Sequence, residues 1–122
     1  MIFLSRRLET SDPRFSGVTI HNGTVYIAGQ VGDVSKIDSS DVSQQTSECL
    51  EKIDQLLTLA GSSKSRILEA RIWLKNINDD MAEMNKVWNQ WVDPQNKGVR
   101  YCVESALAKP QFLVEVQVIA AL

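Results

Sequence analysis

The chain has one histidine, two cysteines and no glycine-rich phosphate-binding loop among its 122 residues. The histidine, His21, stands directly before Asn22-Gly23 and is expected to be a turn residue, and Cys49 and Cys102 do not form a CxxC pair. A zinc site needs several such ligands close together, and a Ser-His-Asp triad needs a histidine beside its serine. We therefore expect no metal and no cofactor, and any chemistry must rest on other side chains.

The chain also lacks an excess of positive charge and a long apolar run. Its 13 lysines and arginines are outnumbered by 15 aspartates and glutamates, so the basic patch that nucleic acids require is not expected. Only three apolar residues follow Met1 before polar residues begin, which is too short for a signal peptide or a membrane span. With two widely separated cysteines, we predict a cytoplasmic protein with reduced thiols and with no nucleic-acid or membrane partner.

What remains is an ordinary globular composition, 43% hydrophobic and 23% charged, over a length that suits one domain. No low-complexity linker or internal repeat divides the chain, so residues 1–122 are expected to form a single domain. Turn residues and hydrophobic periods then predict the order of its elements.

The strongest local signal is Asn22-Gly23, a pair that tolerates the positive φ angles of a two-residue hairpin turn. It predicts strands near 17–21 and 24–31, and a first strand near 2–7 is expected to join them. Three later segments are also predicted to be strands: 66–75, about 99–107 and about 112–120.

Two segments have the three- and four-residue spacing of apolar residues that is typical of amphipathic helices. The first spans 41–60, with Asp41 able to cap its start and Gly61 just past its end. The second spans about 80–92, where Asp79-Asp80 supply an N-cap and negative charge. The order β-β-β-α-β-α-β-β predicts an α/β (α+β) fold with one sheet and both helices packed on one face.

The opposite face of this sheet is predicted to be mixed in character. In the last strand, Glu115 and Gln117 alternate with valines of the helix-covered face. By the same alternation Tyr26, Arg71 and Trp73 lie on that opposite side. Such a surface is too aromatic for free exposure and too charged for the core of a monomer, which indicates a homo-oligomer.

Four segments together resemble the RidA/YjgF family of small trimeric imine and enamine deaminases: GTVYIAGQV (23–31), MNKVWNQW (84–91), VRYCVESALAKP (99–110) and LVEVQVIAAL (113–122). The resemblance spans nearly the whole chain. Its C-terminal part is specific, because Arg100, Pro110 and Glu115 agree with the family in order and spacing at once. It implies a chorismate-mutase-like fold that assembles as a trimeric barrel, with ligand clefts between neighbouring subunits.

The resemblance also implies a reaction. Arg100 would clamp the carboxylate of a 2-imino or 2-enamino acid, a small carboxylate-bearing metabolite, with its planar guanidinium. Glu115 would position or deprotonate the water that attacks the imine carbon, which releases ammonia and leaves a 2-oxo acid. The implied substrate-binding residues are Gly29, Cys102, Asn85, Phe15 and Ala28.

The chain departs from the family pattern around this clamp. Phe15 falls near a tyrosine of the family and has no hydroxyl, and Ala28 replaces a frequent serine. The proline usual shortly before the arginine is missing at Gly98-Val99, and Gln117 stands where a second glutamate is common. Since polar lining is lost while the clamp is kept, the alternative function is a non-catalytic trimeric module that binds or senses small carboxylates.

Structural roles stay open at the same positions. Arg100 can be an ion-pair residue, and Glu115 can form a salt bridge across the sheet with Arg71 or Arg100. Cys102 can be a packing residue, since its backbone is a better candidate for ligand contact than its thiol. Glu104 shares a strand face with Arg100 by alternation and is therefore a second candidate carboxylate.

Overall fold

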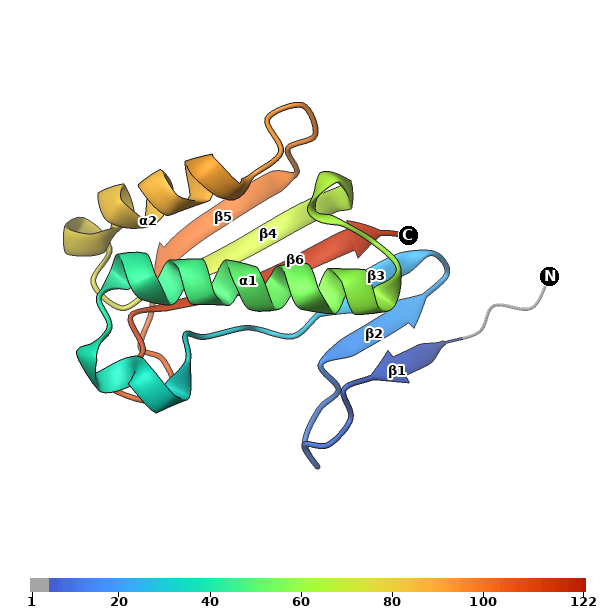
Figure 1. The fold of residues 1–122 in the computed structure, drawn as a ribbon, viewed down its shortest axis with the longest axis horizontal. Coiled ribbons are helices and arrows are strands. Elements are labelled where there is room, and N and C mark those ends of the chain that lie inside the picture. The colour runs from blue at the N-terminus through green and yellow to red at the C-terminus, as the bar shows by residue number, and fades with distance from the viewer. Residues whose placement is uncertain (1–4) are drawn as a thin grey trace.

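The expected order of strands and helices is confirmed in the computed structural model, which describes residues 5–122 (Figure 1). Two short 3₁₀ helices, η1 and η2, are added to it. The elements in chain order are β1 Arg6–Leu8, β2 Val18–His21, β3 Thr24–Ile27, η1 Val34–Ser39, α1 Val42–Ala60, η2 Lys64–Arg66, β4 Ile67–Leu74, α2 Ile77–Trp91, β5 Val99–Glu104 and β6 Val114–Ala121.

The strands form one mixed sheet in the order β1-β2-β3-β6-β4-β5. β4 and β5 are parallel, whereas the other paired strands of residues 5–122 are antiparallel. A parallel pair needs a crossover, and α2 supplies it between β4 and β5. As a result β6 lies inside the sheet and β5 lies at its edge.

Both helices cover the same face of the sheet, as expected (Figure 1). On β6 the residues Val114, Val116 and Val118 are buried under this layer, and the residues between them are half-buried on the other side, which we call the open face. α1 buries Cys49 against the sheet, where its thiol donates to the carbonyl oxygen of Gln30 at 3.2 Å and burial raises the pKa of the thiol to about 12. Cys49 is therefore a core residue.

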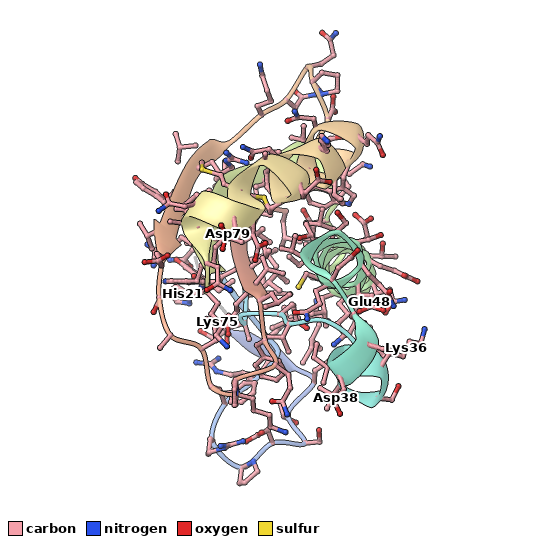
Figure 2. The ribbon with its side chains drawn as sticks, turned by 90° about the vertical axis from the view of Figure 1, so that its left-hand side faces the viewer. His21, Lys36, Asp38, Glu48, Lys75 and Asp79 are labelled. Carbon is pink, nitrogen blue, oxygen red and sulfur yellow. The ribbon has the colours of Figure 1, made fainter. Side chains whose placement is uncertain are left out.

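The local signals at turns and at the ends of α1 are confirmed. Asn22 and Gly23 have φ angles of 52° and 77°, as a two-residue turn between β2 and β3 requires. Asp41 accepts a hydrogen bond from the backbone N–H of Gln44 at 2.9 Å, and Gly61 ends the helix with a φ of 86°. In the side view of Figure 2, α1 carries Glu48 and lies beside η1, which carries Lys36 and Asp38.

The predicted start of the second helix was wrong by three residues. α2 begins at Ile77 rather than near 80, so Asp79 and Asp80 lie in its first turn instead of capping it. The first backbone N–H, that of Ile77, donates to Oε1 of Glu104 at 3.0 Å. This capping group comes from β5 and is not adjacent in sequence.

Several strands are shorter than predicted. β3 ends at Ile27 because its register with β6 is broken: pairing stops at Tyr26 and resumes only at Gln30, while the N–H of Ala28 still donates to the carbonyl of Gly17. β5 ends at Glu104 rather than 107, β6 starts at Val114 rather than 112, and β1 starts at Arg6. Residues 2–4 of the expected first strand lie outside the described residues.

A bulge changes the faces at the start of β4. The register shifts between Ile67 and Glu69, which buries Ile67 and leaves Leu68 51% exposed. Strict alternation from Ala70 would have placed Leu68 in the core.

One buried polar side chain joins α1 to the start of β6. Gln45 is fully buried, and its amide nitrogen donates to the carbonyl oxygens of Ser40 at 3.3 Å and of Gln111 at 3.1 Å. Its amide oxygen accepts from the N–H of Leu113 at 2.9 Å. Both groups of the amide are thereby satisfied, as burial of a polar side chain demands.

Candidate functional site

Arg100 lies on the edge strand β5 and points to the helix-covered side of the sheet. Its Nη1 donates to Oδ1 of Asn85 at 2.8 Å, and its guanidinium carbon lies 5.4 Å from the ring centroid of Trp88. Both partners belong to α2, which crosses over β5. Asn85, implied by the resemblance to bind substrate, thus has its side-chain oxygen in contact with Arg100.

Arg100 has no acidic partner within residues 5–122. The ion pairs found there are Arg14–Asp12, Lys36–Asp33, Arg71–Glu69 and Lys86–Glu83. The Arg100 side chain is half-buried, so its charge is partly removed from water without a counter-ion. A guanidinium in this state is well suited to bind the carboxylate of a ligand through paired hydrogen bonds.

Cys102 and Glu104 follow Arg100 on the same face of β5. Burial raises the pKa of the Cys102 thiol, although the nearby Arg100 charge acts in the opposite direction. A raised pKa disfavours the thiolate, which is the nucleophilic form of cysteine. Glu104, the second candidate carboxylate, accepts a hydrogen bond from the first N–H of α2.

Glu115 lies on the open face of β6, beside Trp73 of β4 in the sheet register. Burial raises the pKa of its carboxyl group. Neither a hydrogen bond nor an ion pair reaches this carboxylate from the part of the chain that the structure describes. The salt bridge considered for Glu115 does not form, because Arg71 pairs with Glu69.

Gly29 leaves the space that the Glu115 carboxylate occupies. The isolated bridge between Gln30 and Val116 brings this loop next to β6. A Cβ atom on Gly29 would lie 3.0 Å from Cδ of Glu115 and would overlap one carboxylate oxygen. The neighbouring Ala28 is half-buried, and its carbonyl accepts from Nε2 of Gln30 at 3.0 Å.

The predicted site residues other than Phe15 thus form two groups. The clamp cluster contains the predicted residues Arg100, Asn85 and Cys102 together with Trp88, and the Glu115 cluster contains Glu115, Gly29 and Ala28. Arg100 pairs in register with the buried Ala70 and contacts α2, whereas Glu115 lies on the open face with β4 between its strand and β5. One chain therefore does not bring Arg100 and Glu115 to the same ligand.

Phe15 lies on the loop between β1 and β2 and is 54% exposed. It is one of several exposed large apolar side chains. On the open face the others include Tyr26 and, along β5, Val99, Tyr101 and Val103, which are 42% to 59% exposed. The predicted mixture of apolar and charged groups on this face is confirmed.

Two residues were missed as contributors to the site. Trp88 was not among the predicted site residues, yet it contacts Arg100; its position three residues after Asn85 was the available signal. Gln45 is a polar residue on the apolar stripe of α1, and it anchors Leu113 two positions before Glu115. A glutamine on an apolar stripe could have suggested such an anchor.

Other features of the described residues do not add chemistry to these clusters. Within residues 5–122 no group of three or more His, Cys, Asp or Glu side chains is placed to hold a metal ion. None of the helices there is long and apolar enough to cross a membrane. A cavity of about 370 Å³ opens at the start of β4, lined by Ser65, Arg66, Ile67, Leu68, Asn96, Lys97 and Ala121, and contains none of the candidate residues.

Comparison with known proteins identifies a family for nearly the whole chain. The family model described as Endoribonuclease L-PSP matches residues 6–122. A RutC family protein of Haemophilus ducreyi is 43% identical over 109 residues, which are 89% of this chain and 90% of that protein. The RutC family protein YoaB of Escherichia coli is 40% identical over 111 residues, 91% of this chain and 93% of YoaB.

Solved structures agree in fold. A member of the YjgF protein family from Neisseria meningitidis superposes with a TM-score of 0.89 at 35% identity, covering 96% of this chain and 93% of its own. An uncharacterized protein from Pseudomonas aeruginosa gives a TM-score of 0.89 at 37% identity, with 97% and 98% coverage.

Proposed function

The chain belongs to the RidA/YjgF family, and we propose that it hydrolyses 2-imino and 2-enamino acids to 2-oxo acids and ammonia. The observation that carries this proposal is the half-buried Arg100, held by Asn85 and Trp88 and without an acidic partner in residues 5–122. The 2-imino acids carry a carboxylate directly beside the reacting carbon. A fixed guanidinium can therefore bind the substrate and orient that carbon at the same time.

We further propose that the site is completed between copies of the chain in a homotrimer. The two clusters lie on opposite sides of one sheet, so a second copy must bring its open face to the β5 edge for Glu115 to meet Arg100. The exposed apolar side chains of Val99, Tyr101 and Val103 on this edge support such a contact. The number of copies rests on the family resemblance.

In this arrangement Arg100 binds the substrate carboxylate and Glu115 acts on a water molecule. Glu115 accepts a proton while the water oxygen bonds to the imine carbon and the C=N electron pair moves to nitrogen. Glu115 then returns the proton to the nitrogen, which gives a neutral carbinolamine. Glu115 next takes the hydroxyl proton of the carbinolamine and passes it to the nitrogen; the oxygen electron pair forms the C=O bond as the C–N bond breaks, so that ammonia departs and a 2-oxo acid remains. A 2-enamino acid first takes a proton at carbon 3 to become the imine.

The environment of Glu115 suits both steps. Its raised pKa brings the carboxyl group closer to the operating pH, where it can accept and return a proton. Gly29 leaves room for the carboxylate and exposes the main chain beside it to a ligand. We propose that the reaction takes place in the cytoplasm, which the free thiols of Cys49 and Cys102 support.

The test is a coupled assay in which a dehydratase generates a 2-imino acid and release of 2-oxo acid is followed. The protein is expected to accelerate release, and Arg100→Gln and Glu115→Gln are expected to abolish the acceleration. Lys86→Gln, which removes an exposed α2 cation that is paired with Glu83, serves as the matched control. Light scattering must show the same oligomer for all variants; acceleration that survives Arg100→Gln would refute the assignment.

The second candidate function is a module that binds small carboxylates without turnover. It is favoured by the residue types at two positions that the resemblance implies for substrate binding, since Phe15 and Ala28 offer no hydroxyl to a reacting water. Thermal-shift titration with 2-oxo acids separates the two functions, because a ligand that binds the native state stabilises it. Binding that depends on Arg100, combined with no acceleration for any imine, would establish this alternative.

The description of the matching family model names a ribonuclease, but we do not extend this activity to the chain. The net charge is −2, and His21 lies exposed at the end of β2 with its Nδ1 in a 2.7 Å hydrogen bond with the Ser5 hydroxyl. Neither feature favours a phosphodiester substrate. We expect no RNA cleavage by the purified protein, and cleavage that tracks the protein through purification would contradict this.

A further inference from the structure

The indole of Trp88 lies against the guanidinium of Arg100, and we propose that Trp88 is a positioning residue that presents Arg100 to the substrate carboxylate. This inference rests on the proposed function, because it concerns the same clamp. It goes further because it assigns to Trp88, a core residue, the role of orienting the Arg100 guanidinium.

The geometry comes from one helix. Asn85 and Trp88 are three residues apart on α2, so their side chains share the helix surface that faces β5. Nη1 of Arg100 donates to Oδ1 of Asn85 at 2.8 Å, and the guanidinium carbon lies 5.4 Å from the Trp88 ring centroid. This separation is within the range, up to about 6 Å, in which an aromatic face attracts a cation.

Both contacts hold Arg100 without cancelling its charge. A carboxylate partner would compete with the substrate for the guanidinium, and none is present in residues 5–122. An amide oxygen and an aromatic face carry no net charge. The cation is therefore fixed while its charge stays available for the substrate.

Packing alone does not require tryptophan at this position. Trp88 is 8% exposed and its ring lies 5.3 Å from that of Trp91, so a large aliphatic side chain could also fill this part of the core. Only an aromatic ring offers a negative face to Arg100. Trp91 provides a natural comparison, because it holds the Lys64 ammonium at 5.5 Å outside both clusters and donates its Nε1–H to Asp54.

An arginine side chain that is already fixed in its binding conformation binds a ligand more tightly than a mobile arginine side chain does. A long side chain loses rotamer freedom when it binds a ligand, and prior fixation removes that loss. For one such side chain the gain corresponds to about two- to tenfold in the dissociation constant.

The experiment replaces Trp88 site-specifically with mono-, di- and trifluorotryptophan, which progressively weakens the negative face of the ring with little change in shape. The dissociation constant for pyruvate, a small 2-oxo acid, is measured by calorimetry. It is expected to rise stepwise to about two- to tenfold, while the same series at Trp91 leaves it unchanged. Trp88→Phe should retain part of the affinity that Trp88→Leu loses.

A second readout follows Arg100 itself. The ¹⁵N order parameter of its Nε–H group should fall along the Trp88 series, and a residue with a merely structural role would not produce this change. If pyruvate binding is lost in Arg100→Gln but neither quantity responds to fluorination at Trp88, the positioning role is refuted and the proposed function stands. A rise in affinity would also refute it, since the indole would then compete with the substrate. If the unmodified protein binds no 2-oxo acid, the proposed function fails and this inference fails with it.

Discussion

Replacing Gly29 with alanine is expected to displace the Glu115 carboxylate while leaving the fold nearly intact. The added Cβ would lie 3.0 Å from Cδ and 3.3 Å from Cγ of Glu115 and would overlap a carboxylate oxygen. The obstructing atoms are the far end of a flexible side chain, so Glu115 can rotate away. Gly29 does not have a positive φ, and alanine can therefore adopt its backbone conformation.

The effect on stability is small because two terms oppose each other. Alanine at a compatible glycine position stabilises by about 0.4–1 kcal/mol through the unfolded chain. Moving the Glu115 side chain off its preferred rotamer costs about 0.5–1.5 kcal/mol. The net change is within about 1 kcal/mol, which for a chain of this size shifts Tm by no more than about 5 °C.

The effect on catalysis is large. A positioned general base is worth roughly 10²- to 10⁴-fold, and kcat in the coupled imine assay is expected to fall within that range. KM should change little, since the carboxylate clamp belongs to the other cluster. The displaced carboxyl group also gains water, so its pKa, followed by carbon-13 NMR, should move back down toward the ordinary value for glutamate.

A double-mutant cycle supplies the control. In a Glu115→Ala background the obstructed side chain is gone, so Gly29→Ala should have no further effect on kcat. The reasoning is refuted if Gly29→Ala turns over as fast as the parent protein with the Glu115 pKa unchanged. It is equally refuted if Gly29→Ala slows the Glu115→Ala protein as much as it slows the parent.

Three further outcomes are expected. Gly98→Ala, whose Cβ would lie 2.7 Å from backbone atoms of Leu68 that cannot rotate away, should lower the free energy of unfolding by about 1–3 kcal/mol in denaturant titration; an unchanged midpoint would contradict the close packing. Gln45→Ala strands the partly buried N–H of Leu113 and should lower that free energy by about 1–3 kcal/mol, whereas stability equal to the parent would mean that water replaces the amide. Because burial raises the pKa of Glu115, kcat/KM should rise with pH through a value above that of an ordinary glutamate, and Glu115→Gln should remove this rise. For stability the sign is opposite: between the unfolded and folded pKa values the folded chain binds more protons, so its stability falls as pH increases, and a Glu115→Gln protein that keeps the same slope would contradict this.

Signals that depend on neighbouring residues predicted the local structure well. The turn at Asn22-Gly23 and both ends of α1 follow from φ preferences and from a side chain that reaches an amide three residues away. The start of α2 was misplaced because its first N–H is held by Glu104, 27 positions further along the chain. No local pattern contains that contact.

The division of the candidate site into two clusters likewise depends on contacts between residues that are distant in the sequence. Alternation correctly placed Glu115 on the open face, but the neighbours of Arg100 depend on β5 being the edge strand, parallel to β4 and under α2. The family resemblance implied that Arg100 is a carboxylate clamp. Which side chains hold that clamp became clear only from the crossover of α2.

The buried amide of Gln45 also ties the mobility of two distant segments together. It joins the residues just before α1 to the segment that leads into β6, across 66 and 68 positions of sequence. Opening of the chain before β6 must therefore break contacts at the start of α1 as well. The amide hydrogens of Leu113 and of the first turn of α1 are expected to exchange with solvent as one unit, and Glu115 is carried on the strand that this unit anchors.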